Sequence, residues 1–319
     1  MLSERKSDII TMTDEALKEI TVGIDNGYLY HKVVSDTGKI IFKSSYTLQD
    51  QSFSGIGNIN IDGTEYNVGA GKLIVDTDKT DSEMNRVGTL TAFAMIGNGI
   101  YNVVVGLPIG QYKAQKDKMK KMVMSYNNCK VIFQNKLMNI KIKNVIVVPQ
   151  GVGALFSTGR KSGSYIVFDI GGLTIDVGLI ETDWLGSPST QKTDTWYKGI
   201  ITLYPKIIEA VNNKFGLTLE PNFAEQILRN GLFIYGEKQD ISFINPIINS
   251  YLDSMFENFI NNYPCKNVPI YLCGGGASIL LPYFKNRFPQ AILIEDAQFA
   301  NAIGFYNIGV QSFKRNQIA

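Results

Sequence analysis

Short runs of alternating apolar and polar residues begin at residue 21 and predict β-strands. Three such runs, over residues 21–24, 28–35 and 39–45, follow one another closely. The segments between them, Asp25-Asn26-Gly27 and Asp36-Thr37-Gly38, consist of residue types that favour tight turns. We therefore expect this part of the chain to form a meander of three antiparallel strands.

Strand and helix patterns alternate through the rest of the first half. A hairpin is expected over residues 59–68 around Asp62-Gly63, and a second one from residues 129–133 and 136–142. Buried strands are expected over residues 101–106 and 144–148, and helices over residues 85–98 and 111–126. Pro149 is expected to begin a further helix that includes Ala154 and Phe156.

The opening pattern recurs from residue 164. Residues 164–170 and 173–181 predict two strands joined by a tight Gly171-Gly172 turn. The expected elements after them are helices over 206–215, 222–229, 247–263, 277–285 and 298–309, with strands over 268–273 and 291–294. Strands that alternate with helices indicate an α/β protein with mixed sheets. The recurrence indicates an internal duplication into two lobes, and ligands tend to bind in the cleft that two lobes leave.

Composition and charge narrow the class of protein. Hydrophobic residues make up 45% of the chain and charged residues 19%, the balance of a soluble globular protein. The net charge of +2 gives no strong surface field. The densest basic stretch, residues 113–121, is interpreted as the solvent-exposed face of a helix. Direct binding to nucleic acid is therefore not expected.

Cysteine and histidine usage argues against a zinc site and a disulfide framework. Cys129, Cys265 and Cys273 have no paired spacing, and His31 is the only histidine. No apolar run reaches the length of a membrane span, and the first residues lack the order of a signal peptide, so we expect a cytoplasmic protein without membrane contact. Residues 1–20 are polar, with a short helical pattern, and are interpreted as an N-terminal extension.

Two turns combine an aspartate at the end of a predicted strand with glycine soon after it. Asp25 is followed by Gly27, and Asp169 by Gly171-Gly172. A phosphate approaches a backbone closely where side chains are absent, and the N–H groups of such a turn bind its oxygens. Thr174 adds a hydroxyl, and the two carboxylates suit Mg²⁺, which prefers oxygen ligands and retains its waters. Each turn alone also fits an ordinary hairpin, but their recurrence in matching contexts favours a phosphate site.

A third turn, Gly274-Gly275-Gly276, lies between a predicted buried strand and a predicted helix. Three glycines at a helix N-terminus permit close packing against a base or a phosphate. Neither a GxGxxG fingerprint nor a GxxxxGK[ST] loop occurs in the sequence. Rossmann dehydrogenases and P-loop enzymes are therefore disfavoured.

Five segments occur in an order that resembles the actin, Hsp70 and sugar-kinase superfamily. They are Asp25-Asn26-Gly27 with Lys32, residues 148–154 (VPQGVGA), residues 168–176 (FDIGGLTID), residues 272–277 (LCGGGA) and residues 298–304 (QFANAIG). In the superfamily these correspond to phosphate one, connection one, phosphate two, adenosine and connection two. Within this superfamily, the chain most resembles prokaryotic actin-like proteins of the ParM kind. The features that favour them are the compact length, the strand end at Gly106-Leu107-Pro108 and the segment 149–153. Those proteins assemble into filaments that segregate plasmids.

The resemblance covers residues 21–309 and implies an actin-like ATPase fold. This fold has two related lobes, each a mixed β-sheet flanked by helices in a duplicated ribonuclease H-like arrangement. Lobe I is expected over residues 21–160 and 298–319, and lobe II over residues 161–297, with a small inserted subdomain over about 200–265.

The resemblance also implies roles for residues of the first lobe. Asp25 is expected to face Mg²⁺, and Asn26, Gly27 and Tyr28 form the loop on the β-phosphate. Lys32 corresponds to a phosphate-binding lysine in actins; without that role it would be a surface charge on a strand.

Gln150 corresponds to the residue that positions the attacking water. Because a carboxamide is a poor base, orientation is its expected role. The alternative is a glutamine without function at the start of a helix.

In the second lobe, Asp169 is expected to be the other metal-side carboxylate and to take part in catalysis. The remaining expected ligands of the nucleotide are Gly171, Gly172, Leu173 and Thr174 at the phosphates, and Gly274, Gly275 and Gly276 at the base. Asp176 also belongs to this segment, and the alternative for it is a purely structural role on the returning strand. Family members also contact base and ribose from the small subdomain, where Glu225 and Arg229 are candidates.

The leading hypothesis is a Mg²⁺-dependent enzyme that hydrolyses ATP or GTP and self-associates head to tail into filaments. A DNA-binding adaptor protein is the expected partner for plasmid segregation. A small-molecule kinase on the same fold is one alternative, but it needs a carboxylate base facing an acceptor hydroxyl, and no loop offers a convincing candidate. A chaperone-like ATPase module is another alternative; an Hsp70 would need a substrate-binding domain after residue 309.

Overall fold

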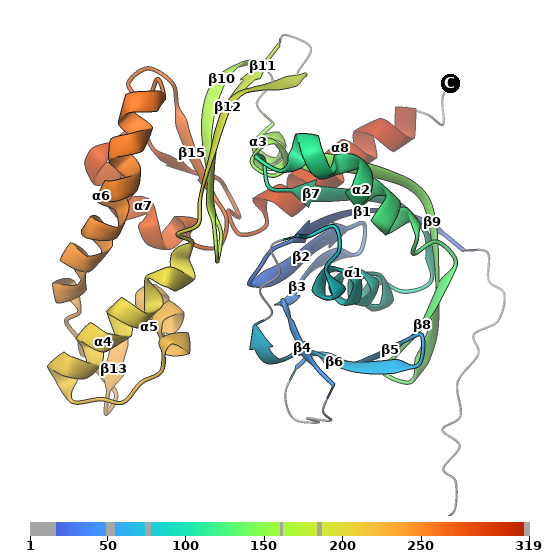
Figure 1. Ribbon diagram of the computed structural model, residues 1–319, viewed down its shortest axis with the longest axis horizontal. Helices are drawn as coiled ribbons and strands as arrows, with labels where there is room; N and C mark the ends of the chain where they lie inside the picture. The colour runs from blue at the N-terminus through green and yellow to red at the C-terminus, as the bar shows by residue number, and fades with distance from the viewer. Residues whose placement is uncertain (1–16, 49–54, 74–77, 160–161, 184–186, 316–319) are drawn as a thin grey trace, which may run out of the picture. The chain divides into compact units, whose positions relative to one another are not determined.

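The computed structural model describes residues 17–48, 55–73, 78–159, 162–183 and 187–315 (Figure 1). The chain divides into two compact units: unit 1 is Met1–Ser157 with Asn301–Ala319, and unit 2 is Thr158–Ala300. Of the predicted N-terminal extension, residues 1–16 lie outside the described residues, and β1 begins before residue 21. No helix in the described ranges is both long and apolar enough to span a membrane.

Unit 1 is built on a nine-stranded sheet with the strand order β3-β2-β1-β7-β9-β8-β5-β6-β4. Strands β1, β2 and β3 pair antiparallel, whereas β7 pairs parallel with both β1 and β9. The predicted meander is confirmed. The strand bounds are β1 (Glu19–Asn26), β2 (Tyr30–Ser35), β3 (Gly38–Lys43), β4 (Ser45–Thr47), β5 (Gly57–Ile61), β6 (Thr64–Leu73), β7 (Gly99–Leu107), β8 (Cys129–Phe133) and β9 (Lys136–Pro149).

The curved sheet of unit 1 wraps around α1 (Glu83–Ile96), which contacts β1, β2, β6, β8 and β9 (Figure 1). Ten of the 14 residues of α1 are buried, so this helix is a core element rather than an amphipathic surface helix. The basic stretch over residues 113–121 lies on α2 (Tyr112–Met124), and its lysines are exposed, as the sequence predicts.

The opposite face of the central strands carries α8 (Ala300–Arg315). Val22 and Ile24 of β1 point into the core around α1, so Gly23 between them points to the other face. A Cβ at Gly23 would overlap the carbonyl oxygen of Ala302 in α8. The helix therefore packs directly onto the backbone of β1.

Unit 2 has a five-stranded sheet with the order β12-β11-β10-β15-β16. Strands β10, β11 and β12 pair antiparallel, and β15 pairs parallel with β10 and β16. This order and these directions match β3-β2-β1-β7-β9 of unit 1. The predicted α/β fold with two related mixed sheets is confirmed. The bounds are β10 (Gly163–Ile170), β11 (Ile175–Thr182), β12 (Pro188–Trp196), β15 (Ile270–Cys273) and β16 (Ile292–Leu293).

The core of unit 2 lies between one face of this sheet and its helices (Figure 1). The fully buried ring of Phe168 in β10 packs edge-on against Phe259 and Phe284, with ring centroids 4.8 and 5.0 Å away. Aromatic pairs in this geometry add to the stabilisation from burial. The helices are α4 (Tyr204–Phe215), α5 (Ala224–Asn230), α6 (Asn245–Asn262) and α7 (Ala277–Arg287), with a small hairpin of β13 (Leu232–Ile234) and β14 (Glu237–Gln239).

The predicted turn at Asp25-Asn26-Gly27 is wrong in its extent. Asp25 and Asn26 belong to β1, where they pair with Lys32 and His31 of β2. The turn consists of residues 27–29. Antiparallel pairing therefore continues up to the glycine, and it places Asp25 directly opposite Lys32.

The predicted boundaries around β9 are also wrong. The two expected strands over residues 136–142 and 144–148 are one strand, in which Lys143 is left out of the register with β7. Pro149 ends this strand opposite Leu107 instead of beginning a helix. The helix starts later, as α3 (Val152–Ser157). Parallel pairing with β7 thus extends β9 to the turn that carries Gln150.

Candidate functional site

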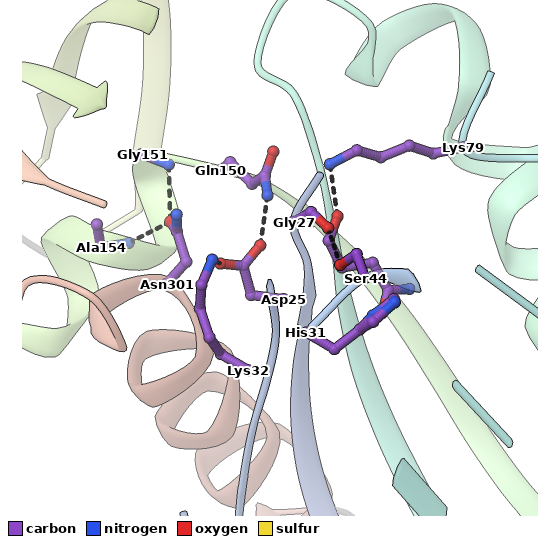
Figure 2. Close-up of polar contacts among 11 residues, drawn as sticks. Asp25, Gly27, His31, Lys32, Ser44, Lys79, Gln150, Gly151, Ala154 and Asn301 are labelled. Carbon is purple, nitrogen blue, oxygen red and sulfur yellow. Dashed lines mark hydrogen bonds and ion pairs between the residues drawn. The ribbon is translucent and has the colours of Figure 1, made fainter. Parts of the chain in front are cut away.

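Asp25 lies at the end of β1 with both carboxylate oxygens hydrogen-bonded (Figure 2). The Nζ of Lys32 lies 2.8 Å from Asp25 Oδ2, and Gln150 Nε2 donates to Asp25 Oδ1 at 2.5 Å. Asp25 and Lys32 are only 2% and 9% exposed, so Lys32 is not a surface charge. Three residues that the sequence singled out, from two separate motifs, form one buried cluster in unit 1.

The charge state of Asp25 follows from these contacts. Burial raises the pKa of its carboxyl group, but the charges of Lys32 and Lys79 and the hydrogen bonds from Lys32 and Gln150 outweigh that effect. The pKa is held below the ordinary value of 3.8. Asp25 is therefore an anion at neutral pH, the form that attracts a divalent cation.

The loop after β1 is held by its carbonyl groups (Figure 2). Lys79 Nζ donates to the carbonyl oxygen of Asn26 at 2.7 Å. Ser44 donates twice, from Oγ to the carbonyl of Gly27 at 2.6 Å and from its N–H to the carbonyl of Leu29 at 2.9 Å. Ser44 and Lys79 belong to none of the motifs, and the sequence analysis missed both.

Gly27 occupies a position with no room for a side chain. A Cβ there would lie 2.6 Å from the carbonyl oxygen of Tyr30 and 2.9 Å from Lys32 Nζ. The turn is therefore closed tightly over the ammonium group of Lys32. Glycine is therefore needed at this position because the Tyr30 carbonyl and the Lys32 ammonium group lie so close, whereas the expected approach of a phosphate stays a prediction.

The side chain of Asn26 points into the core of unit 1. Its Oδ1 lies 2.9 Å from His31 Nδ1, and its Nδ2 donates to Thr89 Oγ1 at 3.2 Å. Both groups of the carboxamide are used inside the fold. The predicted contact of Asn26 with a nucleotide can therefore come only from its backbone.

His31 is the partner that anchors Asn26. Burial, together with the charges of Lys32 and Lys79, lowers the pKa of His31 to about 3. The imidazole is therefore neutral, and its Nδ1–H donates to Asn26 Oδ1. Its Nε2 has no hydrogen-bond partner among the described residues. This atom lies against Gly88 of α1, where a Cβ would overlap the ring.

Gln150 reaches Asp25 because the chain turns sharply after β9. Gly151 has a φ of +81°, a conformation that favours glycine. Asn301 Oδ1, at the start of α8, accepts the N–H groups of Gly151 at 2.9 Å and Ala154 at 3.1 Å (Figure 2). It satisfies backbone donors at the start of α3, as an N-cap residue does, from a distant part of the chain.

Helices α3 and α8 cross in close contact through glycine. A Cβ at Gly304 would overlap the carbonyl oxygen of Gly153, and a Cβ at Gly153 would overlap the ring of Phe305. Both segments were singled out as connection motifs. The structure places them against each other within unit 1, beside the turn that carries Gln150.

The corresponding loop of unit 2, residues 171–174, is also held by its carbonyl groups. The carbonyls of residues 171–173 accept hydrogen bonds of 2.7–3.1 Å from the N–H groups of residues 199–201. The N–H groups of Gly172, Leu173 and Thr174 donate to no acceptor within the ranges that the structure describes. The loop thus presents three backbone donors on the side away from residues 199–201.

Asp169 lies near the end of β10 and beside the third glycine turn. Its Oδ1 would be 2.6 Å from a Cβ on Gly274, so glycine is required for this approach. The hydroxyl of Thr174 donates to Asp176 Oδ2 at 3.1 Å, and Asp176 Oδ1 accepts from Thr195 at 2.5 Å. Asp176 thus braces the loop, and the Thr174 donor left for a phosphate is its N–H.

The third turn, residues 274–276, follows β15 and is bordered by α5. Gly274 has a φ of +88°. Arg229 donates from Nη2 to the carbonyl of Gly275 at 2.5 Å and from Nε to Glu225 at 3.0 Å. The two candidates for base and ribose contacts therefore lie together at the predicted adenosine motif of unit 2.

Two family models match the chain. A model for the N-terminal domain of actin-like proteins matches residues 23–153, and a model for the C-terminal domain of the archaeal MreB-like actin homologue matches residues 167–286. No curated protein matches the sequence.

Several solved structures are similar to the whole chain. A 15-stranded ParM filament from Clostridium botulinum is 22% identical, with a TM-score of 0.74 over 92% of this chain and 100% of that chain. A non-polymerisable quadruple mutant of pCBH ParM is 25% identical, with the same TM-score and coverage. An archaeal actin homologue in complex with ADP is 22% identical, with a TM-score of 0.77 over 92% of this chain and 99% of that chain.

Proposed function

Because the chain belongs to the actin-like proteins, we propose that it binds ATP or GTP with Mg²⁺, hydrolyses it and assembles into filaments. The observation that carries the proposal is the repeated loop geometry. In each unit, an aspartate stands at the end of the first strand, and the loop after it is held by its carbonyl groups. The carbonyl and N–H of one trans peptide point in opposite directions, so the N–H groups of Tyr28 in unit 1 and of residues 172–174 in unit 2 point to the other side. The N–H groups of Gly27 and Gly171 donate within their own turns, to the carbonyls of Tyr30 at 3.2 Å and Thr174 at 2.9 Å.

The phosphate ligands that we propose are the N–H of Tyr28 with Lys32 in unit 1, and the N–H groups of residues 172–174 in unit 2. Gly27 and Gly171 are proposed to leave room for the phosphate, because their own N–H groups donate within the turns. Lys32 is ion-paired with Asp25 in this structure. A bound phosphate competes with that carboxylate for the ammonium group, which frees Asp25 for a cation. The glycines of residues 274–276, with Glu225 and Arg229, are proposed to bind base and ribose.

Asp25 and Asp169 provide the oxygen donors that suit Mg²⁺. Both oxygens of Asp25 are already hydrogen-bonded, so we propose that this carboxylate binds the ion through its waters. Bound Mg²⁺ supplies charge neutralisation at the transferred phosphoryl group. Among the described residues, no three His, Cys, Asp or Glu side chains form a group that could hold a metal ion. Mg²⁺ bound with a nucleotide needs only one or two carboxylates.

Gln150 is proposed to orient the water that attacks the terminal phosphate. Its Nε2 is used on Asp25, and its Oε1 points away from that contact (Figure 2). The oxygen is therefore the atom that accepts a hydrogen bond from water. The Asn301 cap and the close crossing of α3 and α8 hold the turn of Gln150 in place, which suits a role in positioning.

Filament assembly is supported by the similar structures, one of which is a ParM filament. A subunit that binds the next one head to tail forms an open filament when the rotation does not close a ring. We propose plasmid segregation as the biological use, with a DNA-binding adaptor between filament and plasmid. The net charge of +2 gives no basis for direct, sequence-independent DNA binding.

The test combines light scattering with phosphate release after addition of ATP or GTP and Mg²⁺. We expect scattering to rise and then decay in the wild type, and to persist in Gln150→Ala, because hydrolysis is slowed while binding is kept. Gln191→Ala, on the edge strand β12, is the matched control and should behave as the wild type.

Two results would contradict the proposal. Phosphate release without any rise in scattering would exclude filament assembly. Absence of nucleotide binding by the wild type, measured by calorimetry, would exclude the function altogether.

A further inference from the structure

Two buried side chains outside the predicted motifs contact the loop after β1. Ser44, between β3 and β4, is 1% exposed, and Lys79, before α1, is 3% exposed. Lysine is rarely buried to this extent without specific polar contacts. Both side chains donate to backbone carbonyls of the loop, and they do so from different segments of unit 1.

Ser44 sets the orientation of the peptide between Gly27 and Tyr28. Its hydroxyl holds the carbonyl of Gly27 at 2.6 Å, so the N–H of Tyr28 in the same peptide plane points away from Ser44. The N–H of Ser44 holds the carbonyl of Leu29 at 2.9 Å. One residue thus fixes the loop on both sides of Tyr28.

Lys79 fixes the other end of the loop and brings a charge to it. Its Nζ donates to the carbonyl of Asn26 at 2.7 Å and lies 4.7 Å from the ring centroid of Tyr28. Its charge also lowers the pKa of the Asp25 carboxyl. The main chain of Lys79 is tied to α1, because its carbonyl accepts from Asn85 Nδ2 at 2.6 Å. The ammonium group is therefore held in place beside the loop.

We infer that Ser44 and Lys79 are positioning residues for the β-phosphate of a nucleotide. Ser44 acts by orienting the N–H of Tyr28, and Lys79 acts by holding Asn26 and by adding positive charge near the phosphate. This inference rests on the proposed function, and it narrows the ligand class. Binding of nucleoside diphosphates and triphosphates is expected to depend on both residues, whereas a nucleoside monophosphate has no β-phosphate for the loop to bind.

The test measures binding of a nucleoside diphosphate and of the matching monophosphate by calorimetry. Loss of a charge-assisted hydrogen bond predicts about 10- to 100-fold weaker diphosphate binding in Lys79→Met, and loss of a neutral one about 2- to 10-fold in Ser44→Ala. Ser44→Thr keeps the hydroxyl and should restore wild-type binding. Monophosphate binding should be unchanged in all variants.

Matched controls are Lys120→Met, at an exposed lysine of α2, and Ser125→Ala, just after α2, where the hydroxyl donates to the carbonyl of Met122. Both should bind the diphosphate as the wild type does. Lys79→Gln keeps an amide donor without the charge, and it replaces Lys79→Met if that variant does not fold. Hydrogen exchange without nucleotide gives a second readout: amides of residues 27–29 should exchange faster in Ser44→Ala than in Ser125→Ala.

The inference is overturned if diphosphate affinity is unchanged, if monophosphate affinity falls equally, or if Ser44→Thr is as defective as Ser44→Ala. A wild type that binds no nucleotide overturns the proposed function instead, and this inference with it. If the wild type binds the diphosphate and the Ser44 and Lys79 variants bind it with the same affinity, this inference alone is overturned.

Discussion

His31 gives unit 1 a stability that depends on pH in a window where few other groups titrate. The ring is completely buried, stacks on Phe42 with centroids 5.0 Å apart, and donates to Asn26. Burial and the neighbouring positive charges lower its pKa from 6.5 to about 3. Between pH 3 and 6.5 the ring is therefore neutral in the folded protein and protonated in the unfolded chain.

The sign and size of the effect follow from proton linkage. The folded-state pKa lies below the unfolded value, so the unfolded chain binds more protons between pH 3 and 6.5. Stability is complete above pH 6.5 and is lost as the pH falls. Each pH unit below 6.5 removes about 1.4 kcal/mol, which gives a loss of about 2 kcal/mol at pH 5. The pKa of Asp25 is lowered from 3.8, so its own contribution is lost only at more acidic pH.

The assay compares urea unfolding of unit 1 at pH 7.5 and pH 5.0 in the wild type and in His31→Asn. The asparagine amide keeps a donor near the position of Nδ1 and does not titrate. We expect the variant to be less stable at both pH values, because the ring contacts are lost, but to lose less stability on acidification. Because His31 is the only histidine, an NMR spectrum of the protein with labelled histidine should show one imidazole signal. Its chemical shift should remain that of a neutral ring down to pH 4.5.

The reasoning is refuted if the imidazole signal titrates near pH 6.5 in the folded protein. It is also refuted if His31→Asn keeps the full acid-dependent loss, because some other group would then be responsible.

Three further substitutions test the packing and the ion pair. Gly304→Ala should lower the free energy of unfolding by about 1–3 kcal/mol, since its Cβ overlaps the backbone of α3; an unchanged thermal midpoint would contradict the close crossing. Lys32→Met should destabilise unit 1 by about 3–5 kcal/mol at pH 7.5 by leaving Asp25 buried without its partner, and by less at pH 4; equal losses at both pH values would argue against the ion pair. Phe168→Ala should cost unit 2 about 3–5 kcal/mol in urea unfolding, whereas the exposed Phe233→Ala should be nearly neutral; similar losses in the two variants would be inconsistent with the described core.

Local patterns predicted most elements of the fold correctly. The hairpin of β5 and β6 turns at Asp62 and Gly63, whose φ values of +52° and +86° are those that Asp-Gly sequences favour. The helix predicted over residues 247–263 is α6, and its buried apolar residues, most of them three or four apart, face the core of unit 2. In both cases the local pattern and the tertiary packing require the same residues.

Elements without such a pattern were missed. Strand β12 has no regular apolar alternation, because it is an edge strand that forms mainly through backbone pairing with β11. The strands β13 and β14 have only three residues each, which is too short for a recognisable apolar alternation. Backbone hydrogen bonds to a neighbouring strand leave little trace in the residue types of an exposed segment.

The sequence by itself determined the residue types of the candidate site: carboxylates at strand ends, glycines where backbone is closely approached, and a glutamine after a strand. Only the tertiary structure decided which atoms meet. Gln150 and Asp25 are 125 residues apart and are brought together by the parallel order of β1, β7 and β9. Ser44 and Lys79 contact the loop through its backbone carbonyls. Every residue offers such a carbonyl, so no local sequence pattern distinguishes the side chains that bind it.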